Sequence, residues 1–279
     1  MPRYRLLAID IDGTLVNSRN ELTDATRSAV LRAQQAGVQV ALATGRRYSR
    51  VLPLVEPLQL NLPLITASGA LIKRAEDHAT IYRAEFAPGV LADCLAMIDR
   101  AGYEAVVYAD TFDQGFDYYC ATRQPRRAEM AEFLDRNSGC ERIAPRLITD
   151  PPPGVFALFA MATRDEMLAL AEDLERKLRG ELYVHVLRSP RYSGFMCEIA
   201  PAGVSKWTGI LHLAEAWNIA AEEICAAGDD VNDIPMIRAA GLGVAMGNAL
   251  DVVKAAADRI APTHDDDGLV QVVEWLFES

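Results

Sequence analysis

Residues 6–14 of this 279-residue chain, LLAIDIDGT, give the clearest indication of its fold class. Its first four residues are all apolar, and such a short continuous run is typical of a strand that is buried on both faces of a parallel sheet. Asp10 and Asp12 follow the run, and Gly13 marks a turn directly after them. A buried strand that ends in paired carboxylates predicts a polar site at the carboxyl edge of the sheet.

Further strands and helices alternate along the first part of the chain. A helix is predicted from Thr23, a good N-cap, to Ala36, with Gly37 directly after it. Strands are predicted over Val38–Ala43 and Leu62–Ala67, and a polar loop follows each of them. This order predicts an α/β fold with a doubly wound parallel sheet, whose ligands lie outside the carboxyl ends of the strands.

The middle of the chain has a different pattern. Residues 86–197 combine hairpin-like strands with helices, which is typical of an α+β domain. Strands over Ile224–Ala227 and Leu242–Met246 then return to the first pattern. The sequence therefore predicts a discontinuous core, residues 1–85 and 198–279, with an inserted α+β domain. The length agrees, because about 150 residues per domain gives roughly two domains.

The composition excludes several classes of partner. The chain has 28 Lys and Arg against 39 Asp and Glu, a net charge of −11. This excess argues against nonspecific binding of nucleic acid and against binding to an anionic membrane surface. No stretch approaches the ~18 apolar residues that a membrane-spanning helix needs. Five widely spaced cysteines without a CxxC motif indicate reduced thiols, and hence a cytoplasmic location.

Carboxylates gather after two of the predicted strands. Asp10 and Asp12 follow the first strand, and Asp229, Asp230 and Asp233 follow a later one. If both strands lie in one parallel sheet, these like charges converge, which is unfavourable unless protons or a metal offset them. Oxygen-only ligands suit a hard cation such as Mg²⁺. The alternative is that these are ordinary turn residues, since Asp-Gly turns are common in loops.

Four short motifs occur in order along the chain. They are DIDGT at 10–14, TGR at 44–46, GVSK at 203–206 and GDDVND at 228–233. Together the four motifs resemble those of the haloacid dehalogenase superfamily of phosphotransferases, in particular its Cof-type, sugar-phosphatase-like branch. The resemblance covers nearly the whole chain, and the GNA run at 247–249 is also typical of this branch. It implies a Rossmann-like core whose inserted domain is a cap of the C2B type.

The resemblance also implies roles for the acidic residues. Asp10 is expected to be the nucleophile that forms an aspartyl-phosphate, and Asp12 the general acid and base. Dehalogenases lack this second aspartate, so its presence indicates a phosphatase or a phosphomutase. The implied cofactor is Mg²⁺, with ligands from Asp10, Asp12 through its backbone carbonyl, Asp229 and Asp233. Asp233 is also expected to pair with Lys206.

Other residues are expected to hold the phosphate or the substrate. The resemblance assigns this role to Thr44, Gly45, Arg46, Lys206 and Asn232. For Arg46 a surface role is the alternative, and Asp230 is expected to cap a helix. The chain departs from the branch at two positions, with Ser68 where Asn is usual and Trp207 where a small residue is usual.

The leading hypothesis for function is a Mg²⁺-dependent phosphatase, a hydrolase of small phosphate monoesters. Sugar phosphates or related metabolites are the expected substrates, and a monomer or a homodimer the expected state. One alternative is a phosphomutase that resembles phosphomannomutase. Another is a catalytically inactive module that binds phosphate or a ligand, against which the intact set of motif residues argues.

Overall fold

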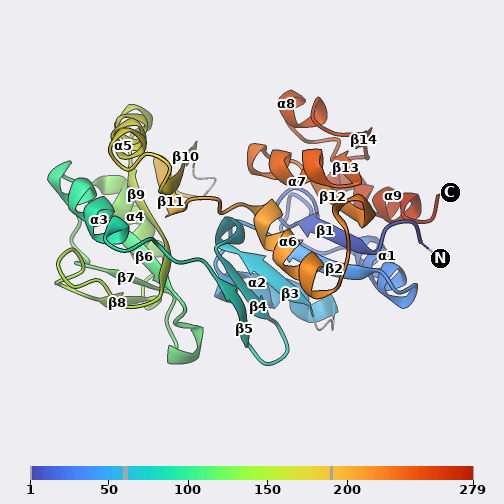
Figure 1. Cartoon of the computed structure of the whole chain (residues 1–279), viewed down its shortest axis with the longest axis horizontal. Coiled ribbons are helices and arrows are strands. Elements are labelled where there is room, and N and C mark those ends of the chain that lie inside the picture. The colour runs from blue at the N-terminus through green and yellow to red at the C-terminus, as the bar shows by residue number, and fades with distance from the viewer. Residues whose placement is uncertain (1, 59–61, 189–190, 279) are drawn as a thin grey trace. The chain divides into compact units, whose positions relative to one another are not determined.

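Two units make up the fold. The first joins Met1–Tyr82 with Ser205–Ser279, and the second is Arg83–Val204. The computed structural model describes residues 2–58, 62–188 and 191–278. Figure 1 shows that each unit is built on a sheet of its own.

The described residues of the first unit form an eight-stranded sheet. In spatial order its strands are β14 (Arg259–Ile260), β13 (Leu242–Ala245), β12 (Ile224–Gly228), β1 (Leu6–Asp10), β2 (Gln39–Ala43), β3 (Pro63–Thr66), β4 (Leu71–Arg74) and β5 (Thr80–Arg83). From β14 to β3 neighbouring strands pair in parallel, and β4 then pairs antiparallel with β3. β1 thus lies inside the parallel part of the sheet.

Helices cover this sheet because its central strands are apolar on both faces. The helices are α1 (Asp24–Gln35), α2 (Tyr48–Val55), α6 (Lys206–Ala216), α7 (Ile234–Ala239), α8 (Asp251–Lys254) and α9 (Gly268–Trp275). Leu6 and Ala8 pack in one core group with residues of α6 and α7. Leu7 and Ile9 are also fully buried, and successive side chains of a strand point to opposite faces. The predicted doubly wound sheet is therefore confirmed.

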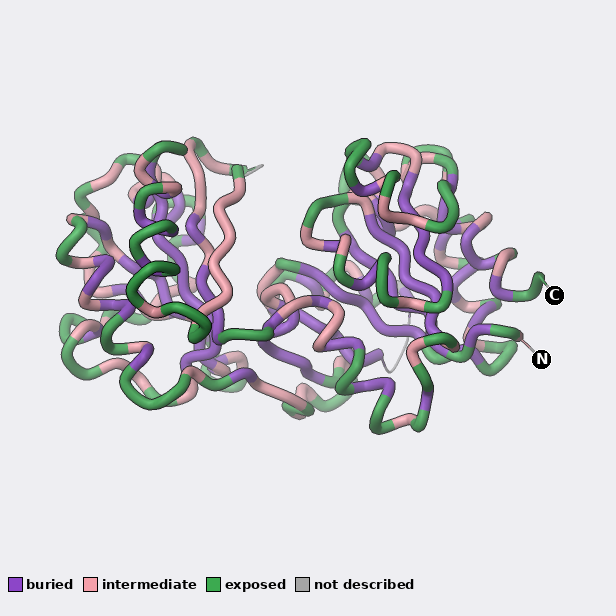
Figure 2. The backbone as a smooth tube through the Cα atoms, turned by 45° about the horizontal axis from the view of Figure 1, so that its top comes forward, coloured by how far each residue is buried: buried purple, intermediate pink, exposed green. Residues whose placement is uncertain are grey.

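The second unit has a six-stranded, mostly antiparallel sheet among its described residues. Its strands, in spatial order, are β10 (Leu182–Arg188), β11 (Phe195–Pro201), β9 (Val155–Ala162), β6 (Val106–Ala109), β7 (Tyr118–Cys120) and β8 (Glu141–Ile143). Its helices are α3 (Val90–Arg100), α4 (Ala128–Arg136) and α5 (Arg164–Lys177). Every residue of β9 is buried, and Figure 2 shows buried backbone along the inner strands of each unit. The predicted inserted α+β unit is confirmed.

Some predicted element boundaries are wrong. The strand predicted over Leu62–Ala67 covers only Pro63–Thr66, because Ala67 and Ser68 turn into the left-handed region with φ of 47° and 56°. The strand predicted to reach Met246 ends at Ala245. The strands β4 and β5 extend the sheet beyond β3 and were not predicted.

Two further features of the fold concern the lengths of its helices and its cysteines. Among the residues that the structure describes, no helix combines the length and apolar character needed to cross a membrane. All five cysteines are free thiols, and four of them are buried.

Candidate active site

Three neighbouring strands bring the candidate site together at their carboxyl ends. β1 lies between β12 and β2, and its last residue, Asp10, is opposite Ala43 of β2. Asp229 directly follows β12, and Thr44 directly follows β2. Parallel pairing therefore collects residues from distant parts of the chain at one edge of the sheet, as predicted.

A buried lysine joins two of the carboxylates. Lys206 Nζ donates to Asp10 Oδ1 at 2.6 Å and to Asp233 Oδ1 at 2.7 Å. At most 5% of any of the three side chains is exposed. Charge-assisted hydrogen bonds of this length are strong where water is excluded, so Asp10 is held in one orientation.

The protein itself occupies both carboxylate oxygens of Asp233. While Oδ1 accepts from Lys206, Oδ2 accepts from the backbone N–H groups of Asp229 and Asp230, both at 3.0 Å. A Cβ atom on Gly228 would lie only 2.4 Å from the carboxyl carbon of Asp233, so the turn needs glycine there. This arrangement favours a supporting role for Asp233, which holds the turn and the lysine.

Asp229 completes a group of three carboxylates. Asp10, Asp229 and Asp233 each offer one oxygen, and these oxygens lie within 4.8 Å of one another. Hard divalent cations prefer oxygen ligands of this kind, and Mg²⁺ is commonly held by one or two carboxylates together with water and substrate phosphate. The donor set therefore fits Mg²⁺.

One lysine does not compensate the charge of this group. Burial raises the pKa of Asp10 well above its ordinary value; Lys206 opposes this shift, and Asp233 and Asp229 add to it. Burial, and then Asp233, raise the pKa of Asp229 to about 7. Burial acts to lower the pKa of Lys206, but Asp10 and Asp233 outweigh it and keep that pKa above its ordinary value. A charged lysine facing three acidic groups leaves an excess of negative charge that a cation would offset.

Asp12 lies apart from the three carboxylates. Its side chain is 58% exposed and forms a bidentate ion pair with Arg46, whose Nε donates to Oδ2 at 2.7 Å and whose Nη2 donates to Oδ1. Only 10% of the Arg46 side chain is exposed, and its Nη2 also donates to Asn20 Oδ1. The Arg46 side chain is thus mostly buried and paired with Asp12, and the choice between a substrate contact and a surface role for it stays a prediction.

Thr44 and Gly45 form the turn after β2. Thr44 is 1% exposed, and its hydroxyl accepts from the backbone N–H of Arg46 at 3.1 Å. A hydroxyl that accepts one hydrogen bond still has its own proton to donate. A Cβ atom on Gly45 would lie 3.4 Å from Ser68 Oγ, so this turn runs close to the one that follows β3.

The turn η2 (Ala67–Gly69) supports the helix that carries the lysine. Gly69 has φ of 107°, and a Cβ atom there would lie 2.0 Å from the carbonyl oxygen of Ser205. This close contact fixes the start of α6, whose first residue is Lys206. Ser68 has a left-handed backbone with φ of 56°, a conformation that Asn adopts more readily than most residues.

Three further predicted residues have distinct surroundings. Asn232 Oδ1 is buried and has no hydrogen-bond partner within the described part of the chain. Asp230 Oδ1 accepts from the backbone N–H of Val231 at 2.7 Å and caps η5 (Val231–Asp233), which confirms the predicted cap. Trp207 is half-buried against the core group beneath α6, so the second departure from the branch is accommodated by packing.

Two polar residues of the site were not predicted. Thr14 Oγ1 donates to Asp229 Oδ1 at 3.4 Å. Asn248 Nδ2 donates to Asp229 Oδ2 at 3.1 Å and to the carbonyl oxygen of Gly13 at 2.9 Å. The GNA run that contains Asn248 is visible in the sequence, but local spacing does not show that its loop meets the turn after β1.

Replacing Gly13 by Ala is expected to damage this turn. Gly13 has φ of +78°, and a Cβ atom there would lie 2.2 Å from Asp229 Oδ2. Gly37→Ala is a matched control, since Gly37 has φ of +88° with nothing within 4 Å. In urea unfolding we expect Gly37→Ala to cost about 1–2 kcal/mol from backbone strain and Gly13→Ala to cost about 1–3 kcal/mol more. Equal losses would show that Asp229 moves aside freely.

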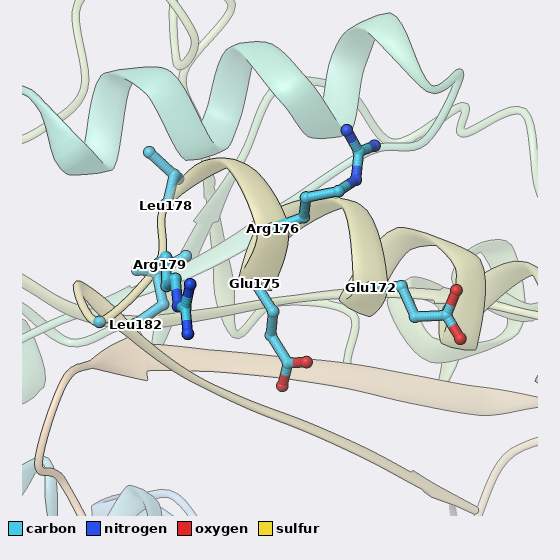
Figure 3. Close-up of a pocket in the computed structure, with 7 residues that line it drawn as sticks. Glu172, Glu175, Arg176, Leu178, Arg179 and Leu182 are labelled. Atoms are coloured by element: carbon cyan, nitrogen blue, oxygen red, sulfur yellow. The ribbon is translucent and has the colours of Figure 1, made fainter.

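A pocket in the second unit is distinct from this site. Its lining residues are Glu172, Glu175, Arg176, Leu178, Arg179, Gly180 and Leu182. Figure 3 shows acidic and basic side chains at the end of α5 around it. The lining includes none of the predicted site residues, and its two glutamates balance its two arginines. Nothing in this pocket favours a phosphate.

Comparisons with known proteins cover almost the whole chain. The family model of the haloacid dehalogenase-like hydrolases matches residues 7–273. The 5-amino-6-(5-phospho-D-ribitylamino)uracil phosphatase YcsE of Bacillus subtilis is 29% identical over 274 residues, which covers 98% of this chain and 96% of that protein. The pyridoxal phosphate phosphatase YbhA of Escherichia coli is 28% identical over 279 residues, with coverage of 96% and 97%.

The fold is also similar to solved structures. A crystal structure of a haloacid dehalogenase-like hydrolase from Bacteroides thetaiotaomicron matches with a TM-score of 0.79 at 28% identity. The match covers 98% of this chain and all of that one. The likeness therefore includes both the sheet that carries the carboxylates and the inserted unit.

Proposed function

The chain belongs to the haloacid dehalogenase-like hydrolase family, and on this premise we propose that it is a Mg²⁺-dependent phosphatase that acts on small phosphate monoesters through Asp10. The observation that carries the proposal is the position of Asp10. It is buried at the end of β1, oriented by Lys206 and grouped with Asp229 and Asp233. The full-length relatives named as phosphatases support the reaction class.

Asp10 acts as the nucleophile in the first step. An oxygen of its carboxylate attacks phosphorus, the bond from phosphorus to the leaving oxygen breaks, and an aspartyl-phosphate forms. Lys206 binds Asp10 Oδ1, so the other oxygen, Oδ2, is the one we assign to the attack. Lys206 and the Thr44 hydroxyl donate to the phosphoryl oxygens, since phosphoryl transfer depends mainly on positioning and charge neutralisation. Bound Mg²⁺ would supply the remaining positive charge for the phosphate.

Asp12 moves the protons. Its carboxyl group protonates the leaving oxygen in the first step. In the second step its carboxylate takes a proton from a water molecule, whose oxygen attacks phosphorus and releases inorganic phosphate and free Asp10. Because Arg46 binds both Asp12 oxygens, the pair must open before Asp12 can act as an acid. The exposure of the Asp12 side chain leaves room for that movement.

The proposed substrates are small phosphorylated metabolites. The two relatives are named for a ribitylamino-uracil phosphate and for pyridoxal phosphate, so sugar phosphates and phosphorylated cofactors or their precursors are the first compounds to assay. The resemblance assigns the choice of leaving group to the inserted domain, predicted over residues 86–197. A cytoplasmic location and a monomeric or homodimeric state stay predictions.

A phosphate-release assay tests the proposal. Sugar phosphates, pyridoxal phosphate, nucleotides and p-nitrophenyl phosphate should release inorganic phosphate when Mg²⁺ is present and stop doing so when it is removed by a chelator. Isomerisation of a sugar phosphate without net phosphate release would instead indicate a phosphomutase. Phosphate binding without any turnover would indicate an inactive binding module.

Binding of Mg²⁺ is expected to weaken in acid. The pKa of Asp229 is raised to about 7, so the metal-free fold disfavours the ionised form of this carboxyl group. The free energy of unfolding of the metal-free protein therefore falls as the pH rises through this pKa. A cation binds the ionised form of Asp229, so its affinity rises as the pH rises. Below about pH 7, each decrease of one pH unit should weaken the Mg²⁺ affinity about tenfold for each proton that the cation displaces. Calorimetric titration with Mg²⁺ between about pH 6 and pH 8 measures this, and equal affinities would contradict it.

A further inference from the structure

Asn248 makes three hydrogen bonds through one amide group. Its Nδ2 donates to Asp229 Oδ2 at 3.1 Å and to the carbonyl oxygen of Gly13 at 2.9 Å. Its Oδ1 accepts from the backbone N–H of His264 at 3.0 Å. One side chain thus connects the turn after β1, the turn after β12 and the segment that precedes α9.

The orientation of this amide follows from chemistry alone. The backbone N–H of His264 can only donate, so the oxygen of the Asn248 amide must face it. The NH₂ group then faces the carbonyl of Gly13, which can only accept, and the ionised carboxylate of Asp229, which also accepts. A reversed amide would place oxygen against oxygen at both contacts. The two protons of Asn248 are therefore committed to Asp229 and to Gly13.

The far end of Asn248 rests on an anchored segment. His264 Nε2 lies 3.1 Å from Ser18 Oγ. Ser18 also donates to Asp265, from its backbone N–H at 2.8 Å and from its hydroxyl at 2.6 Å. These contacts tie the segment at 264–265 to the loop that follows the turn after β1. The Asn248 amide is thus fixed through its oxygen by His264, while its nitrogen binds Asp229.

From these contacts we propose that Asn248 is a positioning residue for the cation site. It is neutral, so it orients Asp229 without adding charge to the group of Asp10, Asp229 and Asp233. By binding Asp229 Oδ2 and the Gly13 carbonyl together, it sets the separation between the turn that carries Asp229 and the turn that follows Asp10. Partners that orient metal-binding carboxylates typically change metal affinity or activity about 10–100-fold when they are replaced. This inference rests on the proposed function.

Direct binding of Mn²⁺, used in place of Mg²⁺ and followed by electron paramagnetic resonance, tests the inference. Asn248→Ala should weaken Mn²⁺ binding about 10–100-fold. Its KM for p-nitrophenyl phosphate at saturating Mg²⁺ should stay within about twofold of the wild-type value, because Asn248 is not assigned a contact to substrate. Asn248→Gln keeps both donors on a longer side chain, and its Mn²⁺ affinity should lie between those of the wild type and Asn248→Ala.

Ser18→Ala is the matched control. It removes the contacts of the Ser18 hydroxyl with His264 and Asp265 but none of the three hydrogen bonds of the Asn248 amide. Its Mn²⁺ affinity should therefore stay within about twofold of the wild-type value. A folded Asn248→Ala protein with wild-type Mn²⁺ affinity and a lower melting temperature would overturn the inference and leave Asn248 a purely structural contact. If Asn248→Ala does not fold, unchanged Mn²⁺ affinity in Asn248→Gln overturns it.

The two proposals fail in different ways. If the wild-type protein binds Mn²⁺ but releases no phosphate from any ester, the proposed function fails, whereas a weaker Asn248→Ala affinity still supports the positioning role. If the wild-type protein hydrolyses phosphate esters with Mg²⁺ and Asn248→Ala binds Mn²⁺ equally well, only the positioning role fails.

Discussion

Asp10→Asn should abolish the hydrolysis of p-nitrophenyl phosphate, with a loss of about 10⁴-fold or more in kcat. An amide of the same shape is a much poorer nucleophile than a carboxylate, so no aspartyl-phosphate can form. Two measurements check this result: the release of p-nitrophenol, and mass spectrometry of acid-quenched enzyme, in which only the wild type should carry one additional phosphoryl group.

The fold of Asp10→Asn should survive the change. Burial and neighbouring carboxylates already raise the pKa of Asp10, so losing its charge relieves repulsion in the metal-free protein. The amide oxygen can still accept from Lys206, which also keeps its ion pair with Asp233. The melting temperature of the metal-free variant should therefore not fall. Asp24→Asn, an exposed change on α1 in the same unit, controls for the substitution itself. Turnover retained in Asp10→Asn would exclude Asp10 as the nucleophile.

Lys206→Met should destabilise the protein as well as inactivate it. Removing one partner from a buried ion pair leaves a buried charge uncompensated, which typically costs about 3–5 kcal/mol. Here the lysine binds both Asp10 and Asp233, and methionine replaces neither hydrogen bond. Urea unfolding of the metal-free protein at neutral pH should show this loss.

The loss in Lys206→Met should shrink in acid. Burial already raises the pKa of Asp10, so lowering the pH favours its neutral form and removes part of the unpaired charge. Lys177→Met, an exposed change in the last turn of α5, should cost no more than about 0.5 kcal/mol. A deficit in Lys206→Met as small as that of Lys177→Met would mean that the carboxylates do not depend on the lysine.

The sheet could be predicted because its signal is local. The apolar run at 6–9 can be buried only by neighbours on both faces, which favours a central strand of a parallel sheet. Such strands collect their following loops at one edge, so the meeting of Asp10 with Asp229 also follows from the order of the elements. The end of β3 was predicted less well, because the backbone enters the left-handed region already at Ala67, two residues before Gly69.

The different hydrogen-bond partners of the individual carboxylates could not be predicted. The sequence places Asp12 beside Asp10 in the motif, yet the structure pairs it with Arg46 and keeps it apart from the other three carboxylates. Likewise both oxygens of Asp233 are occupied by Lys206 and by backbone N–H groups. Which partner each carboxylate binds depends on the hydrogen-bond donors that the folded chain places around its oxygens.

The fold class, the family and the residues that meet at the carboxyl edge of the sheet could be predicted, because hydrophobic periodicity and short motifs are visible in the amino-acid sequence. How those residues are held depends on the tertiary structure. The contacts of Asn248 with Gly13 and Asp229 join loops from opposite ends of the chain. The register of the strands and the conformations of their turns set those distances, and no local pattern in the sequence records them.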